Sequence, residues 1–162
     1  MIILSYPRKN RSLPSFSRLV NYMSSEKADN RYDLYHNCLS RDQSDLTQEF
    51  KDNAQLLRER KNGNYYYHEI LSIDIKDGVD RVRAKESLHD IAGEFVRHRC
   101  PNNLVFGCMH EDHEGHLHYH FMISANEVGD RKKYSLSTTQ FRKLKVACED
   151  YAQEHHAHLK QD

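Results

Sequence analysis

The residues of this chain most able to do chemistry are the histidines between positions 110 and 120. The segment 110–126 reads HEDHEGHLHYHFMISAN. From Gly115 onward apolar and polar residues alternate strictly, which is typical of a β-strand with two different faces. The alternation puts His116, His118 and His120 on one face, about 7 Å apart at about 3.3 Å of rise per residue. Because neutral imidazole is the commonest protein ligand for metals, the pattern predicts a metal site.

The opposite parity of this strand supplies the expected core. Leu117, Tyr119, Phe121 and Ile123 alternate with the histidines. We expect this face to pack on helices and the histidine face to stay open. An open sheet face is a natural platform for single-stranded nucleic acid.

Other segments predict the elements that would build the sheet around the histidine strand. Helical spacing of apolar residues predicts three helices, 16–23, 82–97 and 138–154, and a further one that Asp42 or Ser44 opens. Runs rich in β-formers predict strands at 2–6, 65–75 and 104–109, with a possible short strand within 29–38. The order predicts an α/β (α+β) fold with a central, mostly antiparallel sheet and helices on one face. We expect a single domain, 1–162.

Composition narrows the class of protein. The 162 residues carry 24 Lys and Arg against 24 Asp and Glu, which argues against a binder that relies on bulk positive charge. No apolar stretch approaches the roughly 20 residues that span a bilayer, and no signal peptide is recognisable, so we expect a cytoplasmic protein without membrane insertion. The four cysteines form no C-x-x-C pair, which indicates buried thiols rather than a zinc ribbon or a disulfide framework.

Local basic clusters allow a phosphate-binding groove despite the zero net charge. Two of them are candidate DNA-binding segments, namely Arg8, Lys9 and Arg11, and Arg131, Lys132 and Lys133.

Four segments of the chain resemble one known family. His118-Tyr119-His120 matches the His-hydrophobe-His signature of HUH endonucleases, and together with His110-x-Asp112 it resembles motif III of plasmid mobilisation relaxases (MobA/TraI-like). Three further segments fall in family order: 21–27 is similar to the tyrosine motif, 68–72 to the H-x-x-x-S strand, and 141–151 to the helix after motif III. The resemblance spans nearly the whole chain.

The resemblance implies a relaxase nuclease domain on a permuted ferredoxin-like sheet. Such a domain nicks single-stranded DNA at a transfer origin by tyrosine transesterification, leaving a 5′-phosphotyrosyl link and a free 3′ hydroxyl. Tyr22 is the implied nucleophile, while Tyr6, Tyr32 and Tyr35 are rivals. Asp112 would orient a ligand imidazole or accept the tyrosine proton.

The same resemblance bears on the cofactor. Our choice of ligands is His110, His118 and His120, with His116 as an alternative third ligand. Family members usually use Mg²⁺ or Mn²⁺, although an all-imidazole site should bind Zn²⁺, Co²⁺ or Ni²⁺ more tightly. His68 and Ser72 share a strand parity and are expected either to meet the DNA or the site, or to make structural hydrogen bonds.

The implied setting is conjugative transfer of a plasmid or mobile element in the bacterial cytoplasm. Accessory relaxosome proteins and a type IV secretion coupling protein would be partners, and the domain is either complete or the N-terminal part of a longer protein. Two alternatives stay open. An HUH replication initiator or transposase would use the same chemistry, and a non-enzymatic metal-containing nucleic-acid-binding module would use none. The Ser25-Glu26-Lys27 run and the helix after the histidine strand favour the relaxase.

Overall fold

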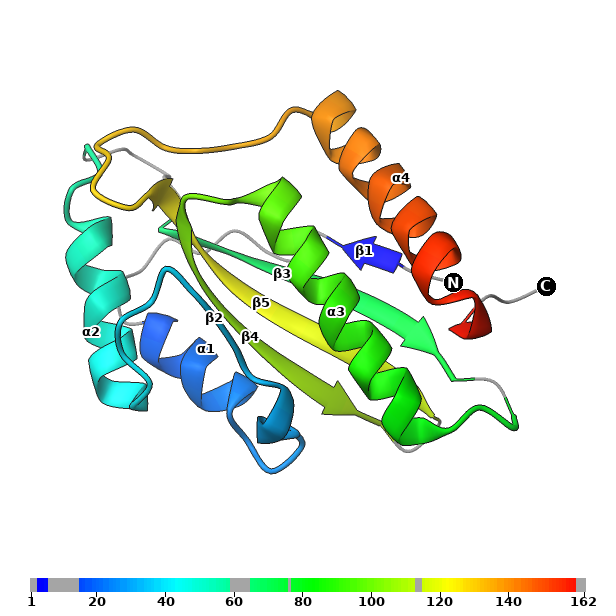
Figure 1. Cartoon of the computed structure of the whole chain (residues 1–162). Coiled ribbons are helices and arrows are strands. Elements are labelled where there is room, and N and C mark those ends of the chain that lie inside the picture. The colour runs from blue at the N-terminus through cyan, green and yellow to red at the C-terminus, as the bar shows by residue number, and fades with distance from the viewer. Residues whose placement is uncertain (1–2, 6–14, 59–64, 76, 113–114, 160–162) are drawn as a thin grey trace.

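The chain folds into one antiparallel sheet flanked by helices (Figure 1). The computed structural model describes residues 3–5, 15–58, 65–75, 77–112 and 115–159. The strands are β1 (Ile3–Ser5), β2 (Leu34–His36), β3 (Tyr66–Asp74), β4 (Asn103–Glu111) and β5 (His116–Glu127). The helices are α1 (Ser15–Met23), α2 (Gln43–Ala54), α3 (Arg81–Arg99) and α4 (Thr138–His155), with short 3-10 turns η1 (Asn30–Tyr32) and η2 (Ala157–Leu159).

The five strands lie in the order β1-β3-β5-β4-β2, and every neighbouring pair is antiparallel. The predicted α+β class and antiparallel sheet are therefore confirmed. The histidine strand β5 is the central strand, hydrogen-bonded to β3 on one side and to β4 on the other. Side chains from three neighbouring strands can therefore meet on either of its faces.

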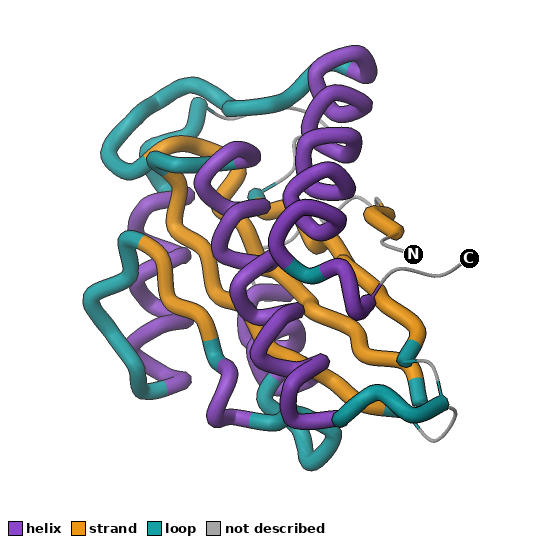
Figure 2. Tube along the Cα trace, turned by 45° about the vertical axis from the view of Figure 1, so that its right-hand side comes forward, coloured by secondary structure: helices purple, strands orange, loops and turns teal. Residues whose placement is uncertain are grey.

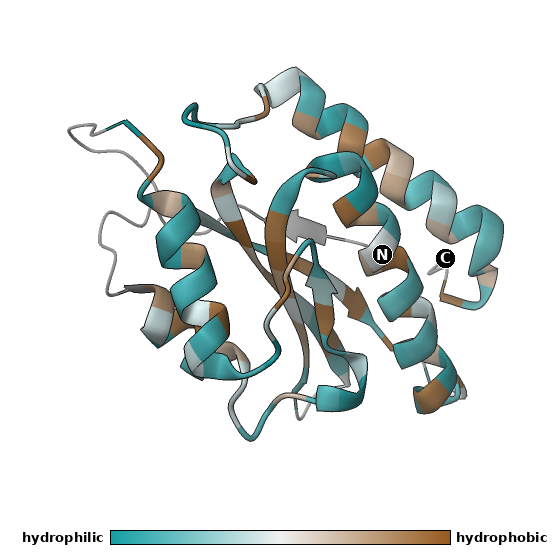
Figure 3. Ribbon diagram, turned by 60° about the vertical axis from the view of Figure 1, so that its left-hand side comes forward, coloured by the Kyte–Doolittle hydropathy of each residue, from teal (hydrophilic) through white to brown (hydrophobic). Residues whose placement is uncertain are grey.

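One face of the sheet packs on α3 and α4. The predicted core parity of β5, Leu117, Tyr119, Phe121 and Ile123, is fully buried in this layer. Phe95 of α3 packs on Phe121, with ring centroids 4.7 Å apart. Figure 3 shows the hydrophobic residues on the strands and on the sheet-facing sides of the helices, while the outer side of α4 is largely hydrophilic. The alternation in the sequence thus predicted this half of the core correctly.

The histidine face is also covered in part, by α1 and α2. The prediction placed helices on one face only, and Figure 2 shows them on both sides of the strands. The amphipathic helices α1 and α2 bury Phe16 and Phe50 against Phe106 and Met122 of the sheet. Because Met122 shares the histidine parity, the far half of that face is apolar enough to hold two helices, and the histidine half is left beside the end of α1.

Within the described residues, no helix combines the length and apolar character needed to cross a bilayer. All four cysteines are free and buried, as the sequence predicted.

Candidate active site

Two neighbouring strands bring the predicted ligand histidines together. His110 of β4 lies directly opposite His118 of β5, and Cys108 lies opposite His120. The ring centroids of His110 and His120 are 4.4 Å apart, and those of His118 and His120 are 6.4 Å apart. The three imidazoles therefore form one cluster on the α1 side of the sheet.

His116, the alternative ligand, lies at the edge of this cluster. Its ring centroid is 6.3 Å from that of His118, and its Nδ1 pairs with the carboxylate of Asp74 on β3. The His116 side chain is therefore paired with a residue of β3.

The last turn of α1 holds Tyr22 over the histidines. The Tyr22 ring centroid lies 5.5 Å from that of His110, 5.6 Å from that of His120 and 6.5 Å from that of His68. Unlike the buried apolar residues of α1, Tyr22 is 49% exposed. Its hydroxyl-bearing ring thus borders both the imidazole cluster and solvent.

The rival tyrosines lie elsewhere. Tyr32 packs on the α3 side of the sheet, where its ring centroid is 5.8 Å from that of His89. Tyr35 of β2 packs on Phe106, with ring centroids 5.3 Å apart. Tyr6 lies outside the described residues. Of the four candidates, Tyr22 is the one that the structure brings to the histidines within the part of the chain that it describes.

The segment around Tyr22 is hydrogen-bonded to the histidine strands. His110 Nε2 lies 2.8 Å from the carbonyl oxygen of Met23, the residue after Tyr22. Farther along, Ala28 forms a β-bridge with His110, and the Asp29 N–H donates to the Met109 carbonyl at 2.9 Å. These contacts fix the end of α1 relative to the imidazole cluster.

A cleft of about 940 Å³ opens between this segment and the sheet, with Tyr22 and the three clustered histidines in its lining. The charged residues that line it are the acids Glu26, Asp29, Glu111 and Asp112 and the bases Lys27 and Arg81. Carboxylates thus outnumber cations four to two in the lining. Two further cations pair with these carboxylates, Arg31 with Asp29 and Lys85 with both Asp29 and Glu111. The charges at the cleft are therefore close to balanced.

Two residues of β3, Ser72 and His68, contact the clustered histidines. The Ser72 hydroxyl lies 2.8 Å from His118 Nδ1, and His68 Nε2 lies 2.9 Å from His120 Nδ1. These are side-chain contacts between paired strands, since Ser72 faces His118 in the β3–β5 register. The sequence left the role of both β3 residues open between DNA contact and structural hydrogen bonding, and the structure places them in contact with the histidines.

Asp112 contacts the other side of the cluster. One of its carboxylate oxygens lies 3.3 Å from His118 Nε2, and the other accepts the His116 backbone N–H at 2.9 Å. His118 is therefore held through Nδ1 by Ser72 and faces a carboxylate through Nε2.

Burial favours the uncharged form of His68, His110 and His120. Burial, and next the charge of His110, lowers the pKa of His68 to about 4. Burial and the neighbouring imidazoles lower the pKa of His120 to about 3, and burial also lowers the pKa of His110. Neutral imidazole is the form that binds metal ions.

The chemistry of these residues fits a divalent cation, although the described side chains contain no group of three or more His, Cys, Asp or Glu arranged to hold one. Hydrogen-bond partners orient the three imidazoles: the Met23 carbonyl contacts His110 Nε2, Ser72 contacts His118 Nδ1 and His68 contacts His120 Nδ1. Asp112 faces the other nitrogen of His118 at 3.3 Å. Holding one nitrogen orients the other, as in metal sites. A site at His110, His118 and His120 stays a prediction.

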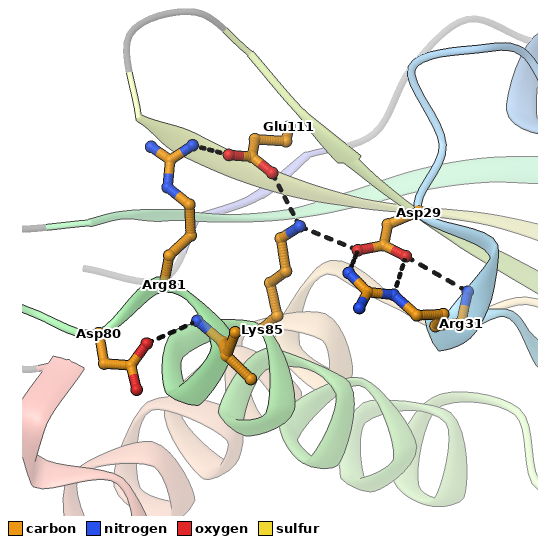
Figure 4. Close-up of polar contacts among 7 residues, drawn as sticks. Asp29, Arg31, Asp80, Arg81, Lys85 and Glu111 are labelled. Carbon is orange, nitrogen blue, oxygen red and sulfur yellow. Dashed lines mark hydrogen bonds and ion pairs between the residues drawn. The ribbon is translucent and has the colours of Figure 1, made fainter.

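The one predicted basic segment that the structure describes, 131–133, is not part of this cleft. Arg131, Lys132 and Lys133 follow the end of β5 that is remote from His118, and Arg8, Lys9 and Arg11 lie outside the described residues. The basic side chains at the cleft come instead from the segment after α1 and from the first turn of α3. Figure 4 shows the ion pairs on the α3 side.

Comparison with known families agrees with this geometry. Residues 22–157 match the relaxase model of the MobA/VirD2-like nuclease domain type, a match that begins at Tyr22 and includes the whole cluster. The chain therefore belongs to the relaxase family, whose members are DNA-nicking nucleases that bind single-stranded DNA at origins and generally use a divalent metal ion. No curated protein shows significant similarity to the chain.

Proposed function

We propose that this domain nicks one DNA strand at a transfer origin by transesterification through Tyr22, for the transfer of a plasmid or other mobile element. The observation that carries the proposal is the position of the Tyr22 ring, 5.5–5.6 Å from the rings of His110 and His120 in the shared cleft. A tyrosine that only packed on the sheet would need no imidazole cluster beneath it.

In the proposed reaction the Tyr22 oxygen attacks the scissile phosphorus and the bond to the 3′ oxygen breaks. The products are a 5′-phosphotyrosyl link and a 3′ hydroxyl, which takes up a proton. Phenol has a pKa near 10 in water, so an acceptor must remove its proton at neutral pH. Asp112 is our candidate acceptor, because it lines the same cleft and is partly exposed.

His110, His118 and His120 would hold the divalent ion. When bound, the ion would neutralise charge on the phosphoryl oxygens and orient the scissile phosphate. Mg²⁺ or Mn²⁺ follows the habit of the family, and Zn²⁺, Co²⁺ or Ni²⁺ suits the imidazole donors.

The wider setting of the proposal is the bacterial cytoplasm, with accessory relaxosome proteins and a type IV secretion coupling protein as partners. A replication initiator or transposase would share the chemistry, and the family match favours the relaxase over both. A non-enzymatic nucleic-acid-binding module is the outcome that the following experiment would reveal.

The test is incubation with labelled single-stranded DNA that contains the element's own origin, followed by denaturing electrophoresis. Wild-type protein should form a covalent adduct, whereas Tyr22→Phe should bind the DNA and form none, because only the attacking oxygen is lost. Tyr32→Phe and Tyr35→Phe are matched controls that should keep the adduct. His120→Ala should fold and lose cleavage.

Two results would contradict the proposal at different levels. An adduct that persists in Tyr22→Phe would move the nucleophile to another tyrosine and leave the relaxase reaction standing. A complete lack of adducts on origin-containing strands, together with intact DNA binding, would leave a binding module and no enzyme.

A further inference from the structure

A network of ion pairs joins the wall of the cleft formed by β4 to α3 and to the segment after α1 (Figure 4). Glu111, which follows His110 at the end of β4, pairs with Arg81 through one oxygen and with Lys85 Nζ at 2.8 Å through the other. Lys85 also pairs with Asp29 at 2.9 Å. Arg81 is the first residue of α3, and Lys85 lies one turn farther along.

The two cations of α3 differ in how firmly they are held. The Lys85 side chain is 11% exposed and lies between two carboxylates. The Arg81 side chain is 49% exposed and, within the described part of the chain, forms its ion pair with Glu111. An ion pair this exposed contributes little to stability, so Arg81 can change partners at small cost, while Lys85 cannot.

Arg81 also lies where it can contact a molecule bound in the cleft. It lines the same cleft as Tyr22 and the histidines. Its Nη2 lies close to the turn between β4 and β5, since a Cβ added to Gly115 would be 3.5 Å from that nitrogen. The other basic residue in the lining is Lys27, on the opposite wall after α1.

The basic loop that the sequence favoured is too far away to serve this cleft. Glu127, where β5 ends, lies nine positions after His118, which corresponds to roughly 30 Å at about 3.3 Å per residue. Arg131, Lys132 and Lys133 lie beyond that end.

We propose that Arg81 binds a backbone phosphate of the DNA strand in the cleft and exchanges Glu111 for it. The inference rests on the proposed function, because it takes the strand to lie beside Tyr22. Glu111 keeps a partner during the exchange, since Lys85 still neutralises it. A guanidinium suits the new partner because its planar array of N–H donors matches two phosphate oxygens at once.

The experiment measures binding to fluorescein-labelled oligothymidylate by anisotropy over a range of salt concentrations. All proteins carry Tyr22→Phe, so that no covalent product forms. A strand of about 20 nucleotides exceeds the roughly 4–16 nucleotides that one single-strand-binding fold covers. Arg81→Gln should weaken binding by about three- to tenfold and reduce the slope of log affinity against log salt by about 0.7, the value for one phosphate contact on a single strand.

Arg83→Gln is the matched control, because Arg83 is also exposed in the first turn of α3 but is not among the residues that line the cleft. Two residues along an α-helix turn the side-chain direction by about 200°, so Arg83 and Arg81 lie on opposite sides of α3. This variant should keep the salt slope of the Tyr22→Phe parent. Arg81→Lys should keep most of the slope, since the charge stays, and recover part of the affinity.

An Arg81→Gln protein with the same affinity and salt slope as the parent would overturn the assignment of Arg81 while leaving DNA binding intact. Equal losses in Arg81→Gln and Arg83→Gln would also overturn it, because they would indicate a diffuse charge effect. Absence of oligothymidylate and origin-DNA binding in the parent would overturn the proposed function and the inference with it.

Discussion

The hydrogen bond between Ser72 and His118 offers a direct test of the metal site. The Ser72 hydroxyl lies 2.8 Å from His118 Nδ1, and a hydroxyl can donate or accept, so it holds the ring in place whichever nitrogen carries the proton. Ser72→Ala removes that partner, so the ring is held only by the longer contact of Nε2 with Asp112 at 3.3 Å. Losing such an outer partner lowers metal affinity by about 10- to 100-fold, or about 1.4–2.7 kcal/mol.

We expect the lower end of that range. The His118 side chain is 33% exposed, so water can replace the lost hydroxyl in part, and about tenfold is our expectation. The assay is calorimetric titration of Mn²⁺ or Co²⁺ into chelator-treated protein, with thermal unfolding to verify the fold. Ser72→Thr is the matched control, because it keeps the hydroxyl and β-branching suits a strand.

Two outcomes would refute this reasoning. Ser72→Ala with unchanged metal affinity, beside a His118→Ala variant that does not bind, would show that the hydroxyl does not orient the ring. Unchanged binding in His118→Ala would remove the proposed metal site itself.

Three further predictions concern stability. Glu69→Ala should lower the free energy of unfolding in urea by about 3–5 kcal/mol, because it leaves the buried Arg99 guanidinium without the carboxylate that binds it at 2.8 and 2.9 Å. A loss below about 1 kcal/mol would contradict this prediction. Gly107→Ala should cost about 1–3 kcal/mol by the same measurement, since its Cβ would lie 2.7 Å from a buried tyrosine ring, and an unchanged midpoint would show that the ring yields. In the presence of a chelator, the free energy of unfolding should decrease as the pH is lowered from about 7 to about 5, by up to about 1.4 kcal/mol per pH unit for each of His68 and His120. The reason is that their pKa values in the folded protein, about 4 and about 3, lie below the unfolded value near 6.5, so the unfolded chain takes up protons first. A flat pH profile would contradict this prediction.

Much of the fold follows from periodicity along the chain. The alternation in β5 assigns Leu117 and Phe121 to the core and His118 and His120 to the other face, and the structure confirms both assignments. The four predicted helices are present, and the helix stripe of Phe16 and its neighbours is buried as expected. These features depend on residues a few positions apart, which is the range that a sequence pattern encodes.

The covering of the histidine face could not be predicted in this way. Met122 stands in the polar parity of β5, and as a single apolar residue it does not indicate whether solvent or a helix lies above it. The covering depends on α1 and α2, whose apolar sides pack on Met122 and Phe106. The histidine face was therefore expected to be open along its whole length, whereas about half of it is core.

The contacts within the candidate site depend on strand register, which the sequence does not encode locally. Ser72 meets His118, and His68 reaches His120 across 52 residues of chain, because β3 pairs with β5 in one particular alignment. A shift of one residue would turn His68 and Ser72 to the opposite face and bring Glu69 toward the histidines. The buried pair of Glu69 with Arg99 opposes that shift, since a slipped strand would leave a buried guanidinium without its carboxylate. The ion pair on the α3 side of the sheet thus stabilises the register that places the imidazole partners on the α1 side.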